Sequence, residues 1–231
     1  MQTKICGITV EIIEKQIKNM HLYVLPPDGR VRVTASVSLS LNDIEMFVRA
    51  KLNWIKKHQE IFRNRPVQPE KQYASGETLY LWGKPFCLQV EYGGRKNSLV
   101  LSENKAILTV RRESTAAQRE KFVNEQYREI LKKKISEILP VWEKITGLYC
   151  SGWQTKNMKT RWGTCNTQTR KIWLNLQLAQ KPPECLEYVI LHELAHLKVK
   201  NHGPRFTAVL DRYMPSWRER KKLLNSKLQD G

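Results

Sequence analysis

The chain has 231 residues, of which 41% are hydrophobic, so it is long enough for a sizeable core in one large or two small domains. It carries 40 Lys and Arg against 22 Asp and Glu, and this net charge of +18 favours polyanionic partners through long-range attraction. No apolar run is long enough to span a bilayer and the first residues contain no signal-peptide core, so we expect a cytoplasmic protein with no membrane partner. The five cysteines are far apart and form no CxxC pair, which argues against a disulfide framework or a Cys-type zinc cluster.

Residues 1–112 are predicted to form a β-rich N-terminal region with one helix. Ser40 and Asp43 resemble a capping box before the amphipathic segment 41–64, and a polar, Pro-rich connector follows. The turn at 92–97, which contains two glycines, is predicted to connect a hairpin. No internal repeat is evident. The strand-like segments are 7–13, 21–26, 31–37, 78–83, 85–92, 98–102 and 106–112.

Residues 113–231 are predicted to form a second, mainly helical domain. Thr115 is a potential cap for a long amphipathic helix, which Pro140 is expected to kink or break. Two strand-like segments joined by a polar turn then predict a small antiparallel sheet. The predicted fold class is therefore α+β. The segments after the long helix are the strands 151–165 and 171–178, a helix from 182 to about 198, and final helices at 204–212 and 215–227.

The sequence HELAH at 192–196 predicts a metal site on a helix. His192 and His196 are four residues apart, so both imidazoles lie on one face and can bind one ion. Glu193 follows the first histidine and is positioned to deprotonate a water molecule, whose pKa zinc lowers to about 7. A catalytic zinc site uses three protein ligands, and the turn at 201–203 can bring His202 back to the pair. The alternative is three solvated or core-capping histidines without a metal.

The sequence HELAHLKVKNHGPRF, together with RWGTC and IWLNLQL, resembles the YgjP-like family of zinc metallohydrolases. This family is related to the small gluzincin-type peptidases and to the SprT and WLM groups. The segments GRVRVTA, FVRAKLNWIKKHQ and GETLYLWGKPFCLQV also match its N-terminal half. The resemblance implies a zincin-like domain in which His192, His196 and His202 bind one Zn²⁺ per chain and Glu193 is the catalytic acid/base. Metzincins share this ligand spacing but have Gly where this chain has Val199, which argues against them.

Three further residues are candidates for substrate binding. Trp162, in the RWGTC sequence, can form a wall of the site. In gluzincin-like peptidases a strand such as 171–178 edges the cleft, so the resemblance implies that Asn175 contacts the substrate, with a turn or packing role as the alternative. Tyr213 is a candidate for stabilising an oxyanion, although core packing is favoured. Cys165 is more consistent with packing beneath the metal helix than with a fourth ligand.

Three functions are compatible with these residues. A zinc-dependent peptidase with a polypeptide substrate is favoured, with Glu193 as general base. The net charge of +18 keeps open a metal-dependent nucleotide pyrophosphatase, whose substrate is a phosphoanhydride. It also keeps open a basic nucleic-acid-associated protein with a zinc site.

Overall fold

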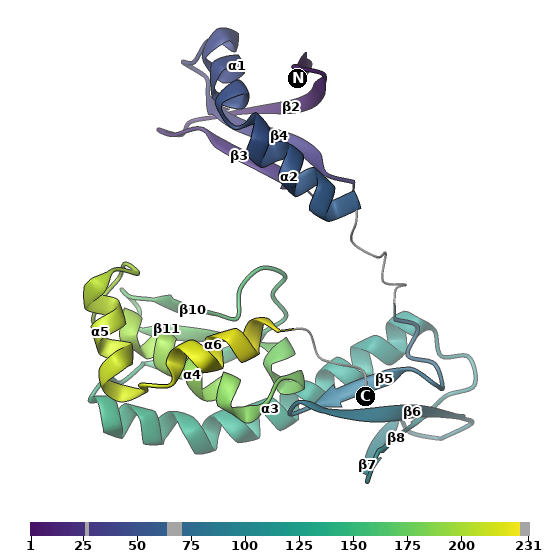
Figure 1. The fold of residues 1–231 in the computed structure, drawn as a ribbon. Helices are drawn as coiled ribbons and strands as arrows, with labels where there is room; N and C mark the ends of the chain where they lie inside the picture. The colour runs from purple at the N-terminus through teal and green to yellow at the C-terminus, as the bar shows by residue number, and fades with distance from the viewer. Residues whose placement is uncertain (26–27, 64–70, 227–231) are drawn as a thin grey trace. The chain divides into compact units, whose positions relative to one another are not determined.

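The computed structural model describes residues 1–25, 28–63 and 71–226, and confirms the predicted α+β class. The chain divides into two compact units, Met1–Glu70 and Lys71–Gly231 (Figure 1). Residues 64–70 of the predicted connector lie outside the described residues. None of the helices in the described ranges is both long and apolar enough to cross a membrane.

The first unit is a four-stranded sheet followed by two helices. The strands have the order β1-β2-β4-β3, in which β2 and β4 are parallel and the outer pairs are antiparallel. The Ser40 capping box is confirmed, because the backbone N of Asp43 donates to Ser40 Oγ at 3.2 Å and the backbone N of Ser40 donates to Asp43 Oδ2 at 2.9 Å. The one helix expected at 41–64 is two helices, which meet at Lys51. The elements are β1 (Gln2–Ile5), β2 (Ile8–Lys15), β3 (His21–Leu25), β4 (Arg30–Ser36), α1 (Leu41–Ala50) and α2 (Leu52–Arg63).

The second unit begins with a sheet of the same topology. Its order is β5-β6-β8-β7, again with a parallel central pair and antiparallel outer pairs. The prediction of a hairpin at 92–97 is wrong, because β8 lies between β6 and β7 in the sheet. The two sheets also bury corresponding positions, such as Val33 on β4 and Leu108 on β8. The strands are β5 (Thr78–Leu81), β6 (Lys84–Tyr92), β7 (Ser98–Ser102) and β8 (Lys105–Val110).

The helix α3 (Ala116–Thr146) joins this second sheet to the rest of its unit. It continues through Pro140, and the buried side chains of Val123, Tyr127 and Leu131 recur every four residues along it. These side chains share one core with Leu88 of the sheet and with the residues that follow α3. For this reason residues 71–112, which the sequence analysis assigned to the N-terminal region, lie in the second compact unit.

A three-stranded sheet and three helices complete the second unit. The sheet order is β10-β11-β9, with β10 antiparallel and β9 parallel to β11, so the sheet is mixed and not purely antiparallel as expected. The helix α4 packs against α3, β10, β11, α5 and α6. The elements are β9 (Gly152–Lys156), β10 (Gly163–Asn166), β11 (Lys171–Asn175), the 3-10 helix η1 (Leu176–Gln180), α4 (Pro183–His196), α5 (Pro204–Tyr213) and α6 (Trp217–Asn225).

Candidate metal centre and active site

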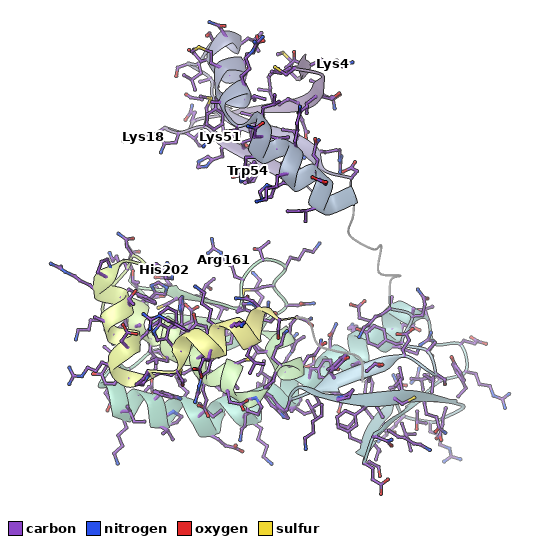
Figure 2. All side chains as sticks on the ribbon, viewed as in Figure 1. Lys4, Lys18, Lys51, Trp54, Arg161 and His202 are labelled. Atoms are coloured by element: carbon purple, nitrogen blue, oxygen red, sulfur yellow. The ribbon has the colours of Figure 1, made fainter. Side chains whose placement is uncertain are left out.

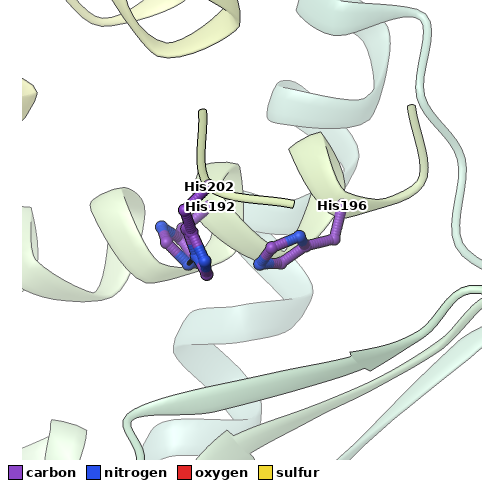
Figure 3. A group of neighbouring side chains, drawn as sticks. All are labelled: His192, His196 and His202. Atoms are coloured by element: carbon purple, nitrogen blue, oxygen red, sulfur yellow. Dashed lines mark hydrogen bonds between the residues drawn. The ribbon is translucent and has the colours of Figure 1, made fainter. Parts of the chain in front are cut away.

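Three histidines meet where α4 ends. His192 and His196 lie one turn apart on α4, and the chain then turns and brings His202 back before Pro204 starts α5. The candidate ligand nitrogens of the three imidazoles all lie within 4.8 Å of one another. Figure 3 shows the ring of His196 turned toward the rings of His192 and His202. The three histidines that the sequence spacing was expected to bring together are therefore neighbours in the structure.

Hydrogen bonds around these rings leave lone pairs available for a cation. His196 Nδ1 lies 3.2 Å from the carbonyl oxygen of Val199, which makes Nδ1 the protonated nitrogen and leaves Nε2 with a lone pair. The Nε2 atoms of His192 and His202 lie 2.9 Å apart, so at most one of them carries a proton. His192 Nδ1 is buried and has no hydrogen-bond partner among the described residues. Neutral imidazoles that face one another without a carboxylate partner fit a divalent cation, and their donor type suits zinc.

The aromatic side chains of Phe206 and Tyr188 pack against the imidazole rings. Phe206 of α5 is 3% exposed, and its ring centroid lies 4.9 Å from that of His192 and 4.7 Å from those of His196 and His202. Tyr188, one turn before His192, is buried and packs edge-on against it at 5.8 Å. Packed rings of this kind fix the imidazole orientations before any ligand binds.

Burial keeps the two helical histidines neutral. It lowers the pKa of His192 to about 3, with further lowering from the neighbouring imidazoles of His196 and His202. Burial also lowers the pKa of His196, and the hydrogen bond to the Val199 carbonyl acts in the opposite direction. Because a metal binds the neutral imidazole, both residues are in the ligand form at neutral pH.

Glu193 is buried beside the histidines, with an exposed fraction of 4%. Burial raises the pKa of Glu193 to about 8, and the positive charge of Arg161 acts in the opposite direction. The carboxyl group lies against the backbone of Gly163 on β10, where any side chain would overlap it. The motif RWGTC therefore provides the space that Glu193 occupies.

These groups open into a cavity of about 570 Å³. The α4 side of its wall includes Tyr188, the three histidines and Glu193. The opposite side is formed by residues of β10 and the loop before it, and α6 closes the cavity with Lys221, Leu224 and Asn225. Figure 2 places Arg161 on the loop before β10 and His202 at the start of α5. The cavity thus joins segments that are up to 64 residues apart in the sequence, from Arg161 to Asn225.

The three predicted substrate-binding residues have different positions. Trp162 lines the cavity, as expected for a wall residue. Asn175 does not line it: its side chain is 4% exposed and bonds the backbone of Met158, Arg161 and Gln177. Asn175 therefore holds the loop that carries Arg161 and Trp162.

Tyr213 also lies away from the cavity. Its hydroxyl donates to the carbonyl oxygen of Thr146 at 3.4 Å, and Arg212 lies over its ring at 5.3 Å. The hydroxyl faces the end of α3, as the packing alternative for this residue requires. Cys165 does line the cavity, and burial raises the pKa of its thiol to about 11, so it is protonated at neutral pH and does not join the histidine group.

The strand beside the cavity differs from the expected one. The segment 171–178 was expected to edge the cleft, but β11 is the central strand of its sheet, with Ile172 and Leu174 buried in the core. Among the described residues β10 and β9 are the two edge strands of this sheet, and Gly163, Thr164 and Cys165 of β10 line the cavity. An extended chain can therefore pair with β10 and not with β11.

Tyr188, Lys200 and Lys221 were not identified from the sequence, although all three line the cavity. Tyr188 is four residues before His192, and this spacing could have placed it on the same helix face. No local pattern indicates the two lysines, because the fold of α5 and α6 back over α4 brings them to the cavity.

Comparison with known proteins gives a family match over most of the chain. The family model described as "YgjP-like, metallopeptidase domain" matches residues 18–227. No curated protein matches the chain.

Two similar solved structures are metallopeptidase zymogens. Abylysin from Pyrococcus abyssi is 20% identical, over 38% of this chain and 89% of that chain, with a TM-score of 0.36. Jannalysin from Methanocaldococcus jannaschii is 29% identical, over 38% of this chain and 90% of that chain, with a TM-score of 0.34.

Proposed function

The chain belongs to the YgjP-like metallopeptidase family, and from this premise we propose that it is a zinc-dependent peptidase with Glu193 as its general base. The family makes it a metal-dependent hydrolase of the peptidase type. The single observation that carries the finer proposal is the convergence of three imidazoles beside a buried carboxyl group in one cavity.

His192, His196 and His202 are the residues that would hold the metal ion. Their nitrogens converge, and His196 is fixed in the required tautomer by the carbonyl oxygen of Val199. The chemistry that zinc supplies to such a site is Lewis acidity, which polarises a peptide carbonyl and lowers the pKa of water. Phe206 packs against all three rings and so helps to hold the imidazoles in place.

Glu193 is the residue that we assign to proton transfer. Its carboxylate accepts a proton from water at one oxygen and returns this proton to the leaving amine. The raised pKa of Glu193 suits a group that must both accept and release a proton near neutral pH, and Arg161 favours the ionised form that starts the cycle. Burial of the carboxyl group also excludes bulk water from its side of the cavity.

The free edge of β10 is where we place the substrate backbone. An extended peptide that pairs with Gly163–Asn166 runs along the cavity wall, beside Glu193. Backbone pairing fixes the position of the peptide bond without reference to its side chains, so it supports a peptidase over an enzyme for small substrates.

Substitution of Glu193 by Gln tests this function. We expect Glu193→Gln to retain zinc, measured by elemental analysis, and to lose hydrolysis of peptides from a proteome-derived library. Glu184→Gln is the matched control, because Glu184 is an exposed residue of the same helix that does not line the cavity. A Glu193→Gln protein that cleaves peptides like the unaltered enzyme would exclude the mechanism.

One observation favours a second candidate, the nucleotide pyrophosphatase. Arg161, Lys200 and Lys221 line the cavity, and cations of this kind also bind phosphate groups. Loss of pyrophosphate release from nucleoside triphosphates in Glu193→Gln would identify this activity. The comparisons give no support for a nucleic-acid partner.

A further inference from the structure

The cavity beside the histidines is strongly basic, and we propose that it selects peptides with an aspartate or glutamate side chain next to the scissile bond. This inference rests on the proposed peptidase function and concerns the substrate class of the same site. Its basis is the position of three cationic side chains, Arg161, Lys200 and Lys221.

The three cations come from three separate segments and meet around one space. Arg161 precedes β10, Lys200 lies in the turn between α4 and α5, and Lys221 lies on α6. Among the described residues that line the cavity, Glu193 is the only acidic one. The wall therefore carries more positive than negative charge even before a metal ion is added, and its potential attracts anionic groups.

On α6, two arginines outside the cavity form ion pairs, whereas Lys221 at the cavity wall forms none with a described residue. On the same helix, Arg218 Nη1 lies 2.6 Å from Asp211 Oδ1, and Arg220 Nη1 lies 2.5 Å from Glu187 Oε2. Lys221 has no ion pair within the described part of the chain, and its Nζ lies 5.8 Å from the ring centroid of Trp217. Within the described part of the chain, neither Lys221 at the cavity wall nor Lys222 outside it forms an ion pair, so the charge of Lys221 is available to an anion that enters the cavity.

Arg161 and Lys200 are similarly available. Neither forms an ion pair in the ranges that the structure describes, and the charge interaction of Arg161 is with Glu193 itself. A carboxylate that enters the cavity would thus meet three cationic donors, none of which has to break an existing ion pair first. Charge-assisted hydrogen bonds from such donors are stronger than neutral ones, and their gain falls as salt increases.

A carboxylate fits this cavity better than a triphosphate. Enzymes that bind nucleoside triphosphates commonly hold Mg²⁺ through carboxylate groups beside the phosphates. In the described part of the chain, the histidine group is the only cluster of at least three potential ligand residues, and the cavity wall offers Glu193 alone as a carboxylate. The free edge of β10 is a further feature that a peptide uses and a nucleotide does not.

The experiment compares paired peptides that differ only in charge. The zinc-loaded full chain is given peptides with Glu or Gln, and Asp or Asn, at each position flanking a bond that it cleaves. We expect kcat/KM to be at least about tenfold higher for the acidic member at one or more positions, since specificity resides in differences of this ratio. The preference should decrease as the salt concentration rises.

Two triple variants with the same loss of charge identify the residues responsible. The cavity variant is Arg161→Gln, Lys200→Gln and Lys221→Gln. The control variant is Lys159→Gln, Lys198→Gln and Lys222→Gln, at exposed positions near the first three that do not line the cavity. We expect the cavity variant to lose the preference for acidic peptides, judged by the ratio of kcat/KM within each peptide pair and not by its absolute rate, and the control variant to keep that preference.

Binding measurements separate this inference from the peptidase proposal. Calorimetric titration of the Glu193→Gln protein with the paired peptides reports the charge preference without turnover, and the acidic peptide is expected to bind at least about tenfold more tightly. Cleavage without any charge preference would overturn the inference and leave the peptidase function standing. If the unaltered protein cleaves no peptide and the titration shows no preference, both fail. Release of pyrophosphate from nucleoside triphosphates that the cavity variant loses and the control variant keeps would then assign the cations to phosphate binding.

Discussion

Gly163 and Glu193 lie in direct contact in the wall of the cavity beside the histidines. A Cβ atom on residue 163 would lie 2.6 Å from Glu193 Oε1 and 2.9 Å from both Cδ and Cγ of the same side chain. Atoms do not approach this closely without a shift of one group. The carboxyl group of Glu193 can therefore occupy this position only because residue 163 is glycine.

We expect Gly163→Ala to reduce peptide hydrolysis about 100-fold, because a displacement of about 1 Å in a reacting group has an effect of this size. Zinc content should remain unchanged, since the new methyl group meets Glu193 and not the histidines. Steady-state kinetics and elemental analysis measure the two quantities. Cys165→Ala, on the same strand and also lining the cavity, serves as the comparison and should have the smaller effect. Full activity in Gly163→Ala would show that Glu193 need not occupy this position.

Removal of the third proposed ligand should abolish the stabilisation by zinc. At a free zinc concentration of about 100 times its Kd, a bound ion stabilises the fold by about 2.7 kcal/mol. For a unit of this size, that corresponds to an increase in Tm of about 5–10 °C. We expect His202→Ala to lose most of this increase and Asn201→Ala, its exposed neighbour, to retain it. An equal shift in both variants, measured by differential scanning fluorimetry with and without a chelator, would contradict the ligand assignment.

Asn175→Ala should destabilise the second unit and disturb the cavity wall. The Asn175 side chain donates to the carbonyl oxygens of Met158 and Arg161 and accepts from the backbone N–H groups of Met158 and Gln177. Loss of these buried bonds is expected to lower the free energy of unfolding by about 2 kcal/mol, as measured by urea denaturation. Asn157 serves as the comparison. It lies in the loop between β9 and β10, is exposed and bonds the side chain of Gln177, so Asn157→Ala should have little effect.

The stability of the protein should fall at alkaline pH. Burial raises the pKa of Tyr73 from 10.0 to about 12, with smaller contributions from Glu120 and Glu77. The raised value means that the folded state keeps the phenol protonated while the unfolded state releases the proton. The stabilisation is therefore complete below pH 10 and is lost as the pH rises through about 12.

The measurement is the urea midpoint at several pH values between 9 and 12. The phenylalanine variant Tyr73→Phe should show a shallower decrease of the midpoint than the unaltered protein over this range. Tyr92, which is 54% exposed, provides the control, and Tyr92→Phe should follow the unaltered curve. Parallel curves for all three proteins would show that Tyr73 does not contribute to the pH dependence.

Helical spacing explains why the histidine group was predictable. His192 and His196 are four residues apart within one helix, so their proximity follows from local geometry. His202 follows a short turn of the same segment, and its approach depends on contacts within about ten residues of His192. The positions of the three imidazoles therefore follow largely from one continuous stretch of sequence, residues 192–202.

Long-range pairing explains what the sequence did not reveal. The glycines at 93 and 94 suggested a hairpin, but the parallel pairing of β6 with β8 depends on contacts across the sheet. The strand 171–178 was expected to edge the cleft, but β11 is central in its sheet, and its buried Ile172 and Leu174 are consistent with that position. Lys221 reaches the cavity only because α6 folds over α4, and no local pattern encodes that packing.

The shared topology of the two four-stranded sheets gives equivalent mutations unequal effects. In the first unit, Val33 packs in a core that α1 and α2 close by themselves. In the second unit, the equivalent Leu108 packs in the core that includes Leu131 of α3 and Leu194 of α4, within the helix of the histidines. Truncation of Val33 would thus leave a void in the core of the first unit. Truncation of Leu108 would leave a void in the core that also contains Leu194 of α4, the helix that carries His192 and His196. The same sheet topology therefore occurs once in the unit Met1–Glu70 and once in the unit whose core supports the helix of the histidines.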